Sequence, residues 1–208
     1  MSAKKDYAFR NGYKCRHHWP IPCGLSKCIN QILITKISDM ASIQKVTPNL
    51  WFNKQAEEAA KYYTSIFKNS RIGKMTRYGK EGFETTHMPE GAVLTVEFFL
   101  DGQQFVALNA GPEFKFNESV SFIINCDTQE EVEYYWEKLS EGGDEKAQMC
   151  GWLKDRYGLS WQVVPVEVWD LWRDEKSEAY QRAMRAMLQM KKLDIKKLKQ
   201  AFEGKQSS

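Results

Sequence analysis

The sequence predicts an α+β fold in which two β-α-β-β-β modules form a cupped sheet, followed by C-terminal helices. Two observations lead to it. The same order of strand-like and helix-like patterns occurs in residues 43–110 and again in residues 119–165. Beyond the second module only helical periodicity remains. We therefore expect a disordered extension over residues 1–39, a two-module domain over residues 40–170 and a helical tail over residues 171–208.

The composition is that of a globular protein. Of the 208 residues, 42% are hydrophobic and 13% aromatic, which is enough to bury a core. No apolar run approaches the roughly 20 residues of a membrane span, so we expect no membrane partner. The net charge is +3, but residues 1–39 hold seven Lys or Arg against two Asp or Glu, and the remainder holds 23 against 25. A near-neutral body without a basic stripe argues against a nucleic-acid partner.

The first 39 residues differ from the rest of the chain. The segment CRHHWPIPCGLSKC, residues 15–28, holds three cysteines and two histidines, but no Cys-x-x-Cys pair of the kind that structural zinc sites usually have. We favour a tail whose cysteines have no specific role over a zinc site. The apolar run QILITKI is short and contains Lys36, which argues against a secretory signal. A weak organelle-targeting role stays open, because the segment is basic.

Cysteine is sparse after the extension. Cys126 and Cys150 lie in apolar strand patterns, where a buried, reduced thiol is the usual state. This use of cysteine indicates a reducing, cytoplasmic location.

The first module begins with a strand and a helix. Asn53 is a suitable N-cap for that helix. Its apolar residues recur at steps of three and four and form one stripe: Ala56, Ala59, Ala60, Tyr63 and Phe67. Asp101-Gly102 is a strong hairpin signal between the last two strands. The strands are predicted over residues 43–52, 71–78, 92–100 and 104–109.

The second module repeats this order in a shorter stretch of chain. Thr128 followed by Glu131 forms a capping box that opens its helix. The buried stripe of this helix consists of Val132, Tyr135, Trp136 and Leu139. Strands are predicted over residues 120–126, 147–154 and 159–164, and one short strand of the repeat is not identified.

The tail contains two amphipathic helices, over residues 178–190 and after Asp194, which is a suitable N-cap. Met184, Met187 and Met190 share one side of the first. An adaptable partner surface is one explanation of such a stripe. Core packing or a dimer contact explains it more simply.

Three long motifs resemble the PhnB-like branch of the glyoxalase/bleomycin-resistance superfamily, also called vicinal oxygen chelate proteins. They are TPNLWFNKQAEEAAKYYTSIFKNSRIGKMTRYG, FNESVSFIINCDTQEEVEYYWEKLSEGG and CGWLKDRYGLSWQVVP. The run AMRAMLQMKKLDIKKLKQAF resembles the helical tail of that branch. The resemblance covers nearly all of residues 43–202 and none of residues 1–39. It implies the paired-module fold around a cavity, and a homodimer.

Members of this branch are often labelled 3-demethylubiquinone 3-methyltransferase. The sequence contains no glycine-rich G-x-G-x-G loop after a strand to hold S-adenosylmethionine. That speaks against a methyltransferase activity.

The resemblance also implies positions for a divalent metal ion, near Pro48, at Ser119 or Ser121, at Asn109 and at Gln162. Proline offers no ligand group, and hydroxyls and amides are poor substitutes for carboxylates or imidazoles. Outside the extension the only histidine is His87, in an expected loop. We therefore predict that the chain holds no metal ion and no other cofactor.

A cavity without a metal ion would be an apolar cup with a few polar groups. Its predicted lining consists of Phe52, Glu97, Phe99, Asn109, Ser121, Cys150, Trp161 and Gln162. Because strand residues alternate between faces, a register error of one residue would turn any of them away. Core packing remains an equal alternative for the three aromatic residues.

Three side chains are weak candidates for chemistry. Glu97, within the apolar strand LTVEFFL, could act as a general base, although exposure on an edge strand explains it as well. Cys150 is more simply a structural thiol than a nucleophile, because no histidine is near it in the sequence. His87 is a solvated loop residue or, less simply, part of a lid.

Two functions from different classes follow. The first is a metal-free dimer that binds a small, partly aromatic molecule. The second is an enzyme of lyase, isomerase or dioxygenase type, working through a metal ion with unexpected ligands or through acid–base chemistry at Glu97.

Overall fold

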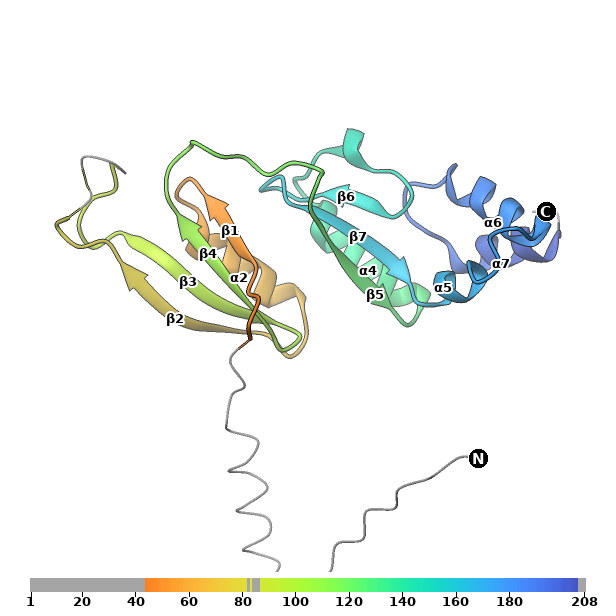
Figure 1. Ribbon diagram of the computed structural model, residues 1–208, viewed down its shortest axis with the longest axis horizontal. Coiled ribbons are helices and arrows are strands. Elements are labelled where there is room, and N and C mark those ends of the chain that lie inside the picture. Colours follow the sequence, from red (N-terminus) through yellow and green to blue (C-terminus); the bar gives the residue numbers. More distant parts are fainter. Residues whose placement is uncertain (1–43, 82, 84–86, 206–208) are drawn as a thin grey trace, which may run out of the picture. The chain divides into compact units, whose positions relative to one another are not determined.

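The computed structural model describes residues 44–81, 83 and 87–205. Its first module has the predicted order of one strand, one helix and three strands (Figure 1). The sheet has the strand order β1-β4-β3-β2, with β1 parallel to β4 and the other pairs antiparallel. Its elements are β1 (Asn49–Phe52), α2 (Ala56–Ile66), β2 (Arg71–Arg77), β3 (Val93–Leu100) and β4 (Gln103–Asn109). The predicted extension over residues 1–39 lies outside the described residues.

Helix α2 covers one face of this sheet. The residues of α2 that are fully buried include three alanines, which let the helix approach the strands closely. They pack on alternate residues of β3 and β4, among them Val96, Phe98 and Ala107. The opposite face, which we call the outer face, carries the half-buried residues between them, such as Phe99 and Val106.

The start of α2 differs from the prediction. The N-cap position is Gln55, which makes no side-chain cap hydrogen bond, rather than Asn53. The first helical N–H, that of Ala56, instead donates to Asn109 Oδ1 at 2.8 Å. The capping acceptor is therefore a residue at the end of β4, and not the neighbouring Asn53 that the local sequence suggested.

The second module has a shorter sheet, of three strands in the order β5-β7-β6. A 3₁₀ turn stands where the first module has β2. Thr128 caps α4 as predicted, because its Oγ1 accepts from the N–H of Glu131 at 3.2 Å. The Glu131 carboxylate accepts from the N–H of Asp127 at 2.9 Å, one residue before the expected partner of the capping box. The elements are β5 (Ser121–Cys126), α4 (Gln129–Ser140), the 3₁₀ turn η1 (Glu145–Ala147), β6 (Trp152–Lys154) and β7 (Ser160–Pro165). The α+β class with two sheets and C-terminal helices is thus confirmed.

A buried aspartate in the β6–β7 turn joins the two modules. Asp155 is 2% exposed. Its Oδ2 accepts from Tyr63 Oη of α2 at 2.7 Å and from Trp161 Nε1 at 2.8 Å. Its Oδ1 accepts from the N–H groups of Tyr157 at 2.8 Å and Leu159 at 3.1 Å. Burial raises the pKa of Asp155, and these four donors oppose that rise.

Aromatic rings fill the space around this aspartate. Tyr63 contacts Phe98 of its own module and Trp161 of the other, with ring centroids 6.1 Å and 5.5 Å apart. Tyr134 Oη of α4 donates to the carbonyl of Ile66 at 2.9 Å. One hydrophobic core therefore runs through both modules.

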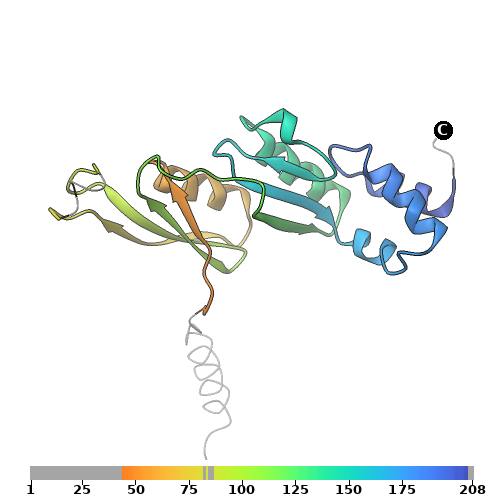
Figure 2. The ribbon, with the colours of Figure 1, turned by 45° about the horizontal axis from the view of Figure 1, so that its top comes forward.

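The tail consists of α5 (Glu167–Leu171), α6 (Glu178–Met187) and α7 (Ile195–Glu203), which follow β7 (Figure 2). Asp194 caps α7 as predicted, accepting from the N–H of Lys197 at 2.9 Å. Arg182 of α6 donates to the carbonyls of Ala201 and Phe202, at 3.0 Å and 2.6 Å, at the other end of α7. In the described part of the chain, no helix combines the length and the apolar character needed to cross a membrane.

A second hydrophobic cluster holds the tail against β7. It consists of Val164, Val168, Met187, Leu193 and Leu198, with Met184 and Met190 packed against it. The methionine stripe therefore lies in a core, which is one of its two simpler explanations.

Candidate functional site: a pocket between the second sheet and the tail

The outer face of the second sheet is where polar and apolar side chains meet. On β7, Trp161 and Val163 point toward α4, so Gln162 and Val164 point the other way. Gln162 Nε2 donates to Ser121 Oγ at 2.9 Å. This hydrogen bond fixes the amide group on the outer face.

A pocket of about 600 Å³ lies over this face. We call it the tail pocket. Its strand side is formed by Trp152, Gln162 and Val164, one wall by the segment 146–150, and its cover by tail residues. The tail residues are Trp169, Trp172, Met187 and Leu193.

The wall at residues 146–150 is held by backbone hydrogen bonds to the tail. The N–H of Cys150 donates to the carbonyl of Met190 at 2.8 Å, and that of Gly151 to Lys191 at 2.7 Å. Gly151 has φ +84°, and a Cβ on it would lie 2.9 Å from the carbonyl oxygen of Val163. Only glycine fits this position without strain, so the local sequence fixes the distance between wall and sheet.

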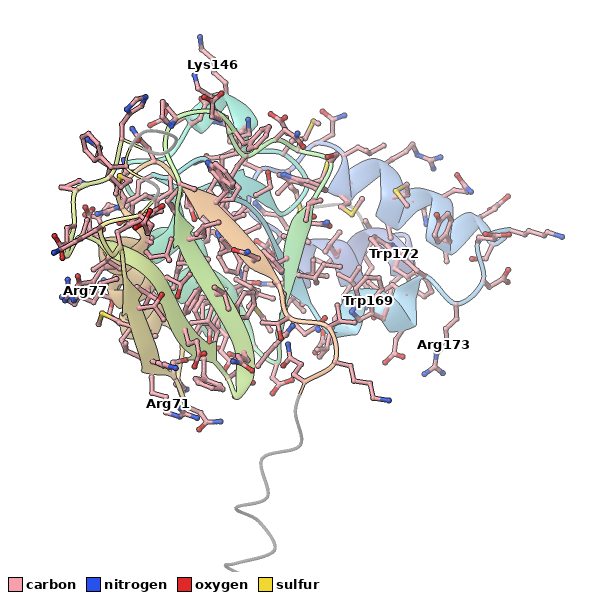
Figure 3. All side chains as sticks on the ribbon, turned by 60° about the vertical axis from the view of Figure 1, so that its left-hand side comes forward. Arg71, Arg77, Lys146, Trp169, Trp172 and Arg173 are labelled. Carbon is pink, nitrogen blue, oxygen red and sulfur yellow. The ribbon has the colours of Figure 1, made fainter. Side chains whose placement is uncertain are left out.

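Two tryptophans of α5 and its end form a corner of the pocket. The rings of Trp169 and Trp172 are 5.6 Å apart at an interplanar angle of 87°. Trp169 Nε1 donates to Asn125 Oδ1 of β5 at 3.2 Å, which ties the corner to the sheet. Both indoles lie side by side next to α5 in Figure 3. A flat ring can meet the face of one indole and the edge of the other in such a corner.

Two charged residues line the pocket, Glu118 and Lys146, and both are exposed. Glu118 forms an ion pair with Lys154, and the Lys154 ammonium lowers the pKa of Glu118. Lys146 lines the rim, but its side chain extends away from the ribbon in Figure 3. The interior is therefore largely apolar, with Gln162 as its central polar group.

Cys150 also lines the pocket. Its backbone has φ +54°, in the left-handed region that cysteine rarely adopts. Burial raises the pKa of its thiol, which lowers the fraction of nucleophilic thiolate at neutral pH. These properties agree better with a wall residue than with a nucleophile.

The structure brings together three of the eight predicted lining residues. Gln162 and Cys150 line the tail pocket, and Ser121 holds Gln162. Phe52, Asn109 and Trp161 do not face this side, because they lie buried on the helix-covered faces of the sheets.

The remaining two, Glu97 and Phe99, lie on the outer face of the first sheet. The Arg71 guanidinium stands 3.6 Å above the Phe99 ring. A Cβ on Gly73 would lie 3.0 Å from Glu97 Cβ, so β2 and β3 are close here. No described residue of this face lines the tail pocket.

The residues at the implied metal positions are engaged with other partners. The carbonyl of Pro48 accepts from the N–H of Val106 at 2.9 Å. Asn109 accepts from Ala56 and donates to the carbonyl of Val93. Ser121 and Gln162 bind each other. This donor set does not fit a divalent metal ion.

Within the described ranges, no three His, Cys, Asp or Glu side chains lie close enough to form a metal site. His87 has φ +54° and its ring meets the edge of Phe83 at 6.3 Å. Neither finding tests the prediction that the protein as a whole binds no metal ion.

A second hollow of about 530 Å³ lies beside β5, between the turn at Asp101 and the residues around Ile123. Its floor includes Phe105, Tyr135 and Trp161, which belong to the main core.

The second hollow contains two of the predicted lining residues, Ser121 and Trp161, and so does the tail pocket, with Cys150 and Gln162. We take the tail pocket as the candidate site because three indoles and two methionines line it together with the Gln162 amide.

Sequence reasoning missed the tryptophans of the tail pocket. Trp169 and Trp172 are three residues apart in VEVWDLW, a helical spacing that places both rings on one side. Their spacing was a usable signal. Trp152 gave none, because only the antiparallel register opposite Gln162 places it on the outer face.

Comparisons with known proteins agree on the two modules. A family model described as 3-demethylubiquinone-9 3-methyltransferase matches residues 44–164. No curated protein matches the chain. The matched range ends before α5, so the tail side of the pocket lies outside it.

Three solved structures are similar to 59% of the chain. The PhnB protein from Bacillus cereus is 34% identical over 100% of its own length, with a TM-score of 0.51. A protein from Staphylococcus aureus is 30% identical over 96% of its length, with a TM-score of 0.27. A protein from Pseudomonas aeruginosa is 22% identical over 97% of its length, with a TM-score of 0.46.

Proposed function

The chain belongs to the PhnB-like family described as 3-demethylubiquinone-9 3-methyltransferase, and from this membership together with the tail pocket we propose that it binds a small, partly aromatic molecule without a metal ion. The observation that carries the proposal is the pocket itself. Ligand sites are typically concave, mostly apolar and equipped with a few fixed polar groups. Three indoles, two methionines and the Gln162 amide meet that description.

A methyltransferase activity has little support in the sequence. Binding of a dinucleotide-type or adenosyl cofactor usually relies on a glycine-rich turn between a strand and a helix. The turn between β1 and α2 reads NKQ, and that between β5 and α4 reads DT. We therefore take the family description to indicate which proteins the chain is related to, and not which reaction it catalyses.

The alternative is an enzyme that uses Glu97 or a metal ion. Glu97 is half-buried on the outer face of the first sheet, next to Phe99, which gives it a partly apolar environment. Elemental analysis of the purified chain, followed by titration with Zn²⁺, Ni²⁺ and Mn²⁺, separates the two functions. One tightly bound equivalent would favour the enzyme.

We also propose a cytoplasmic homodimer. The outer face of the first sheet carries half-buried Trp51, Phe99, Val106 and Leu108, which a second copy of the chain could cover. Both cysteines of the described part are free thiols, as expected in a reducing compartment.

The binding proposal is tested with a panel of one-ring and two-ring aromatic compounds that includes neutral, anionic and cationic members. Binding is followed by ligand-observed NMR and then by calorimetry. We expect at least one saturable binder whose affinity falls about tenfold in Trp172→Ala, the loss of one good aromatic contact.

Phe99→Ala is the matched control, because it removes an aromatic ring from the other sheet. It should leave the affinity unchanged. Binding that depends on Phe99 and not on Trp172, or no binder at all, would refute the tail pocket as the functional site.

A further inference from the structure

We infer that the tail pocket takes an uncharged, flat aromatic molecule that donates a hydrogen bond to the side-chain oxygen of Gln162. The inference rests on the proposed function and adds the chemical class of the ligand. Shape, hydrogen-bonding capacity and charge each contribute one part of it.

The shape of the pocket favours a flat ring. Trp169 and Trp172 meet at 87°, and Trp169 is fixed by its hydrogen bond to Asn125. A corner of two indoles at this angle offers one stacking surface and one edge at the same time. An aliphatic ligand of equal size would use neither geometry.

The hydrogen-bonding capacity is set by Gln162. Its amide nitrogen donates to Ser121 Oγ, which leaves the amide oxygen as the free end of the side chain. In the part of the chain that the structure describes, no hydrogen bond to this oxygen is made. Gln162 lies directly opposite Trp152 in the antiparallel pair, so the acceptor stands beside an indole. A hydroxyl or N–H on the ligand ring would meet it.

The charges favour a neutral ligand. Glu118 and Lys154 form an ion pair, and the exposed Lys146 side chain, which lines the pocket, extends away from the ribbon in Figure 3. The other lining side chains named above are apolar, indole, thiol or amide groups. A charged ligand group placed beside Gln162 would lose hydration among apolar and indole side chains.

Four naphthalene probes that share one ring system test these statements on the full chain. 2-Naphthol is neutral and carries a donor, whereas 2-methoxynaphthalene is neutral without a donor. 2-Naphthoate is an anion and 2-naphthylmethylamine is a cation at neutral pH. We expect 2-naphthol to bind at least about tenfold more tightly than each of the other three, by calorimetry or equilibrium dialysis.

Two variants of Gln162 assign the effect to this residue. In Gln162→Met the preference for 2-naphthol over 2-methoxynaphthalene should fall to about one, because the acceptor is gone. In Gln162→Glu the affinity for the cation 2-naphthylmethylamine should rise at least about tenfold, because its ammonium can pair with the new carboxylate. The Ser121 hydroxyl can donate to that carboxylate and hold it in place. Gln189→Met makes the same change at an exposed glutamine outside the pocket lining and should alter nothing.

The possible outcomes separate the two proposals. If a charged probe binds best, or if 2-methoxynaphthalene equals 2-naphthol, the ligand class is wrong, and a loss of that binding in Trp172→Ala would still support the pocket as the site. If no probe binds, or if binding ignores both Trp172 and Gln162, the ligand class and the proposed function fail together.

Discussion

Asp155 joins the two modules by accepting four buried or half-buried hydrogen bonds, one of them from Tyr63 of the first module. Replacement by asparagine keeps the size of the side chain but turns one acceptor oxygen into an NH₂ group. Either orientation of the amide then faces two of the four donors with a donor of its own. We expect Asp155→Asn to lower the free energy of unfolding by about 2–4 kcal/mol, measured by urea denaturation.

Asp174→Asn is the matched control, because Asp174 is exposed and makes a local bond to the N–H of Lys176. Its effect should stay within about 0.5 kcal/mol. Equal effects of the two variants would contradict the role of Asp155.

The two described cysteines should differ in reactivity. Burial raises the pKa of Cys126 to about 12, and its side chain is fully buried. A raised thiol pKa means a smaller thiolate fraction at pH 8, so iodoacetamide should leave Cys126 unmodified in the folded protein. Cys150 is partly exposed and should react slowly, and faster as the pH rises through its raised pKa.

Peptide-resolved mass spectrometry reads the two sites separately from the cysteines of the extension. In urea both sites should be labelled, which serves as the control for peptide detection. Modification of folded Cys126 at the rate of Cys150 would contradict the described burial.

At the level of single residues, the sequence predicted what depends on near neighbours. The caps at Thr128 and Asp194 were predictable because their partners lie three residues away. The Asn53 cap was wrong because Asn109 competes for the same N–H from the end of β4. The side to which Phe52 and Trp161 point depends on strand pairing, which a single sequence leaves open by one residue.

Among the elements, the 3₁₀ turn of the second module replaces a strand for a local reason. Gly143 lies so close to β6 that a Cβ on it would stand 2.1 Å from the carbonyl oxygen of Lys154. Asp144 then caps the turn by accepting from the N–H of Lys146 at 2.9 Å. Helix α4 ends at Ser140, and residues 145–147 form η1 where the first module has a strand.

Gly143→Ala should therefore destabilise the second module by about 1–3 kcal/mol, since the backbone of β6 must shift to make room. Thermal or urea unfolding measures this. Gly79→Ala is the control, because a Cβ at Gly79 meets nothing within 4 Å. A neutral Gly143→Ala variant would show that the turn and β6 can separate without cost.

On the scale of the whole molecule, the two sheets differ in what covers their outer faces. The tail lies over the second sheet through Val164 and Val168, whereas described residues leave Phe99, Val106 and Leu108 of the first sheet half-buried. The repeat of modules and the tail helices were predictable from periodicity. The packing of the tail onto one sheet was not, because amphipathic helices show an apolar side without showing its partner.

The proposed dimer gives a test on this scale. Light scattering should give twice the chain mass of 24.2 kDa, and Val106→Lys on the outer face of the first sheet should shift the protein toward the monomer. A lysine there would have to be desolvated in the interface, a cost that pairing with Glu97 on the neighbouring strand offsets only in part. Lys138→Met on α4 is a surface control. A monomeric wild-type chain at high concentration would exclude the dimer.

The hydrogen bonds from Cys150 and Gly151 to the carbonyls of Met190 and Lys191 have a practical consequence. They join the wall of the pocket directly to the link between α6 and α7, so the two segments should move together. A molecule seated in the pocket should therefore slow tryptic cleavage after Lys191 and Lys192, and an early nick at that link should release it. Timed digestion with and without the best binder would show whether an intact link between α6 and α7 is needed to retain the bound molecule.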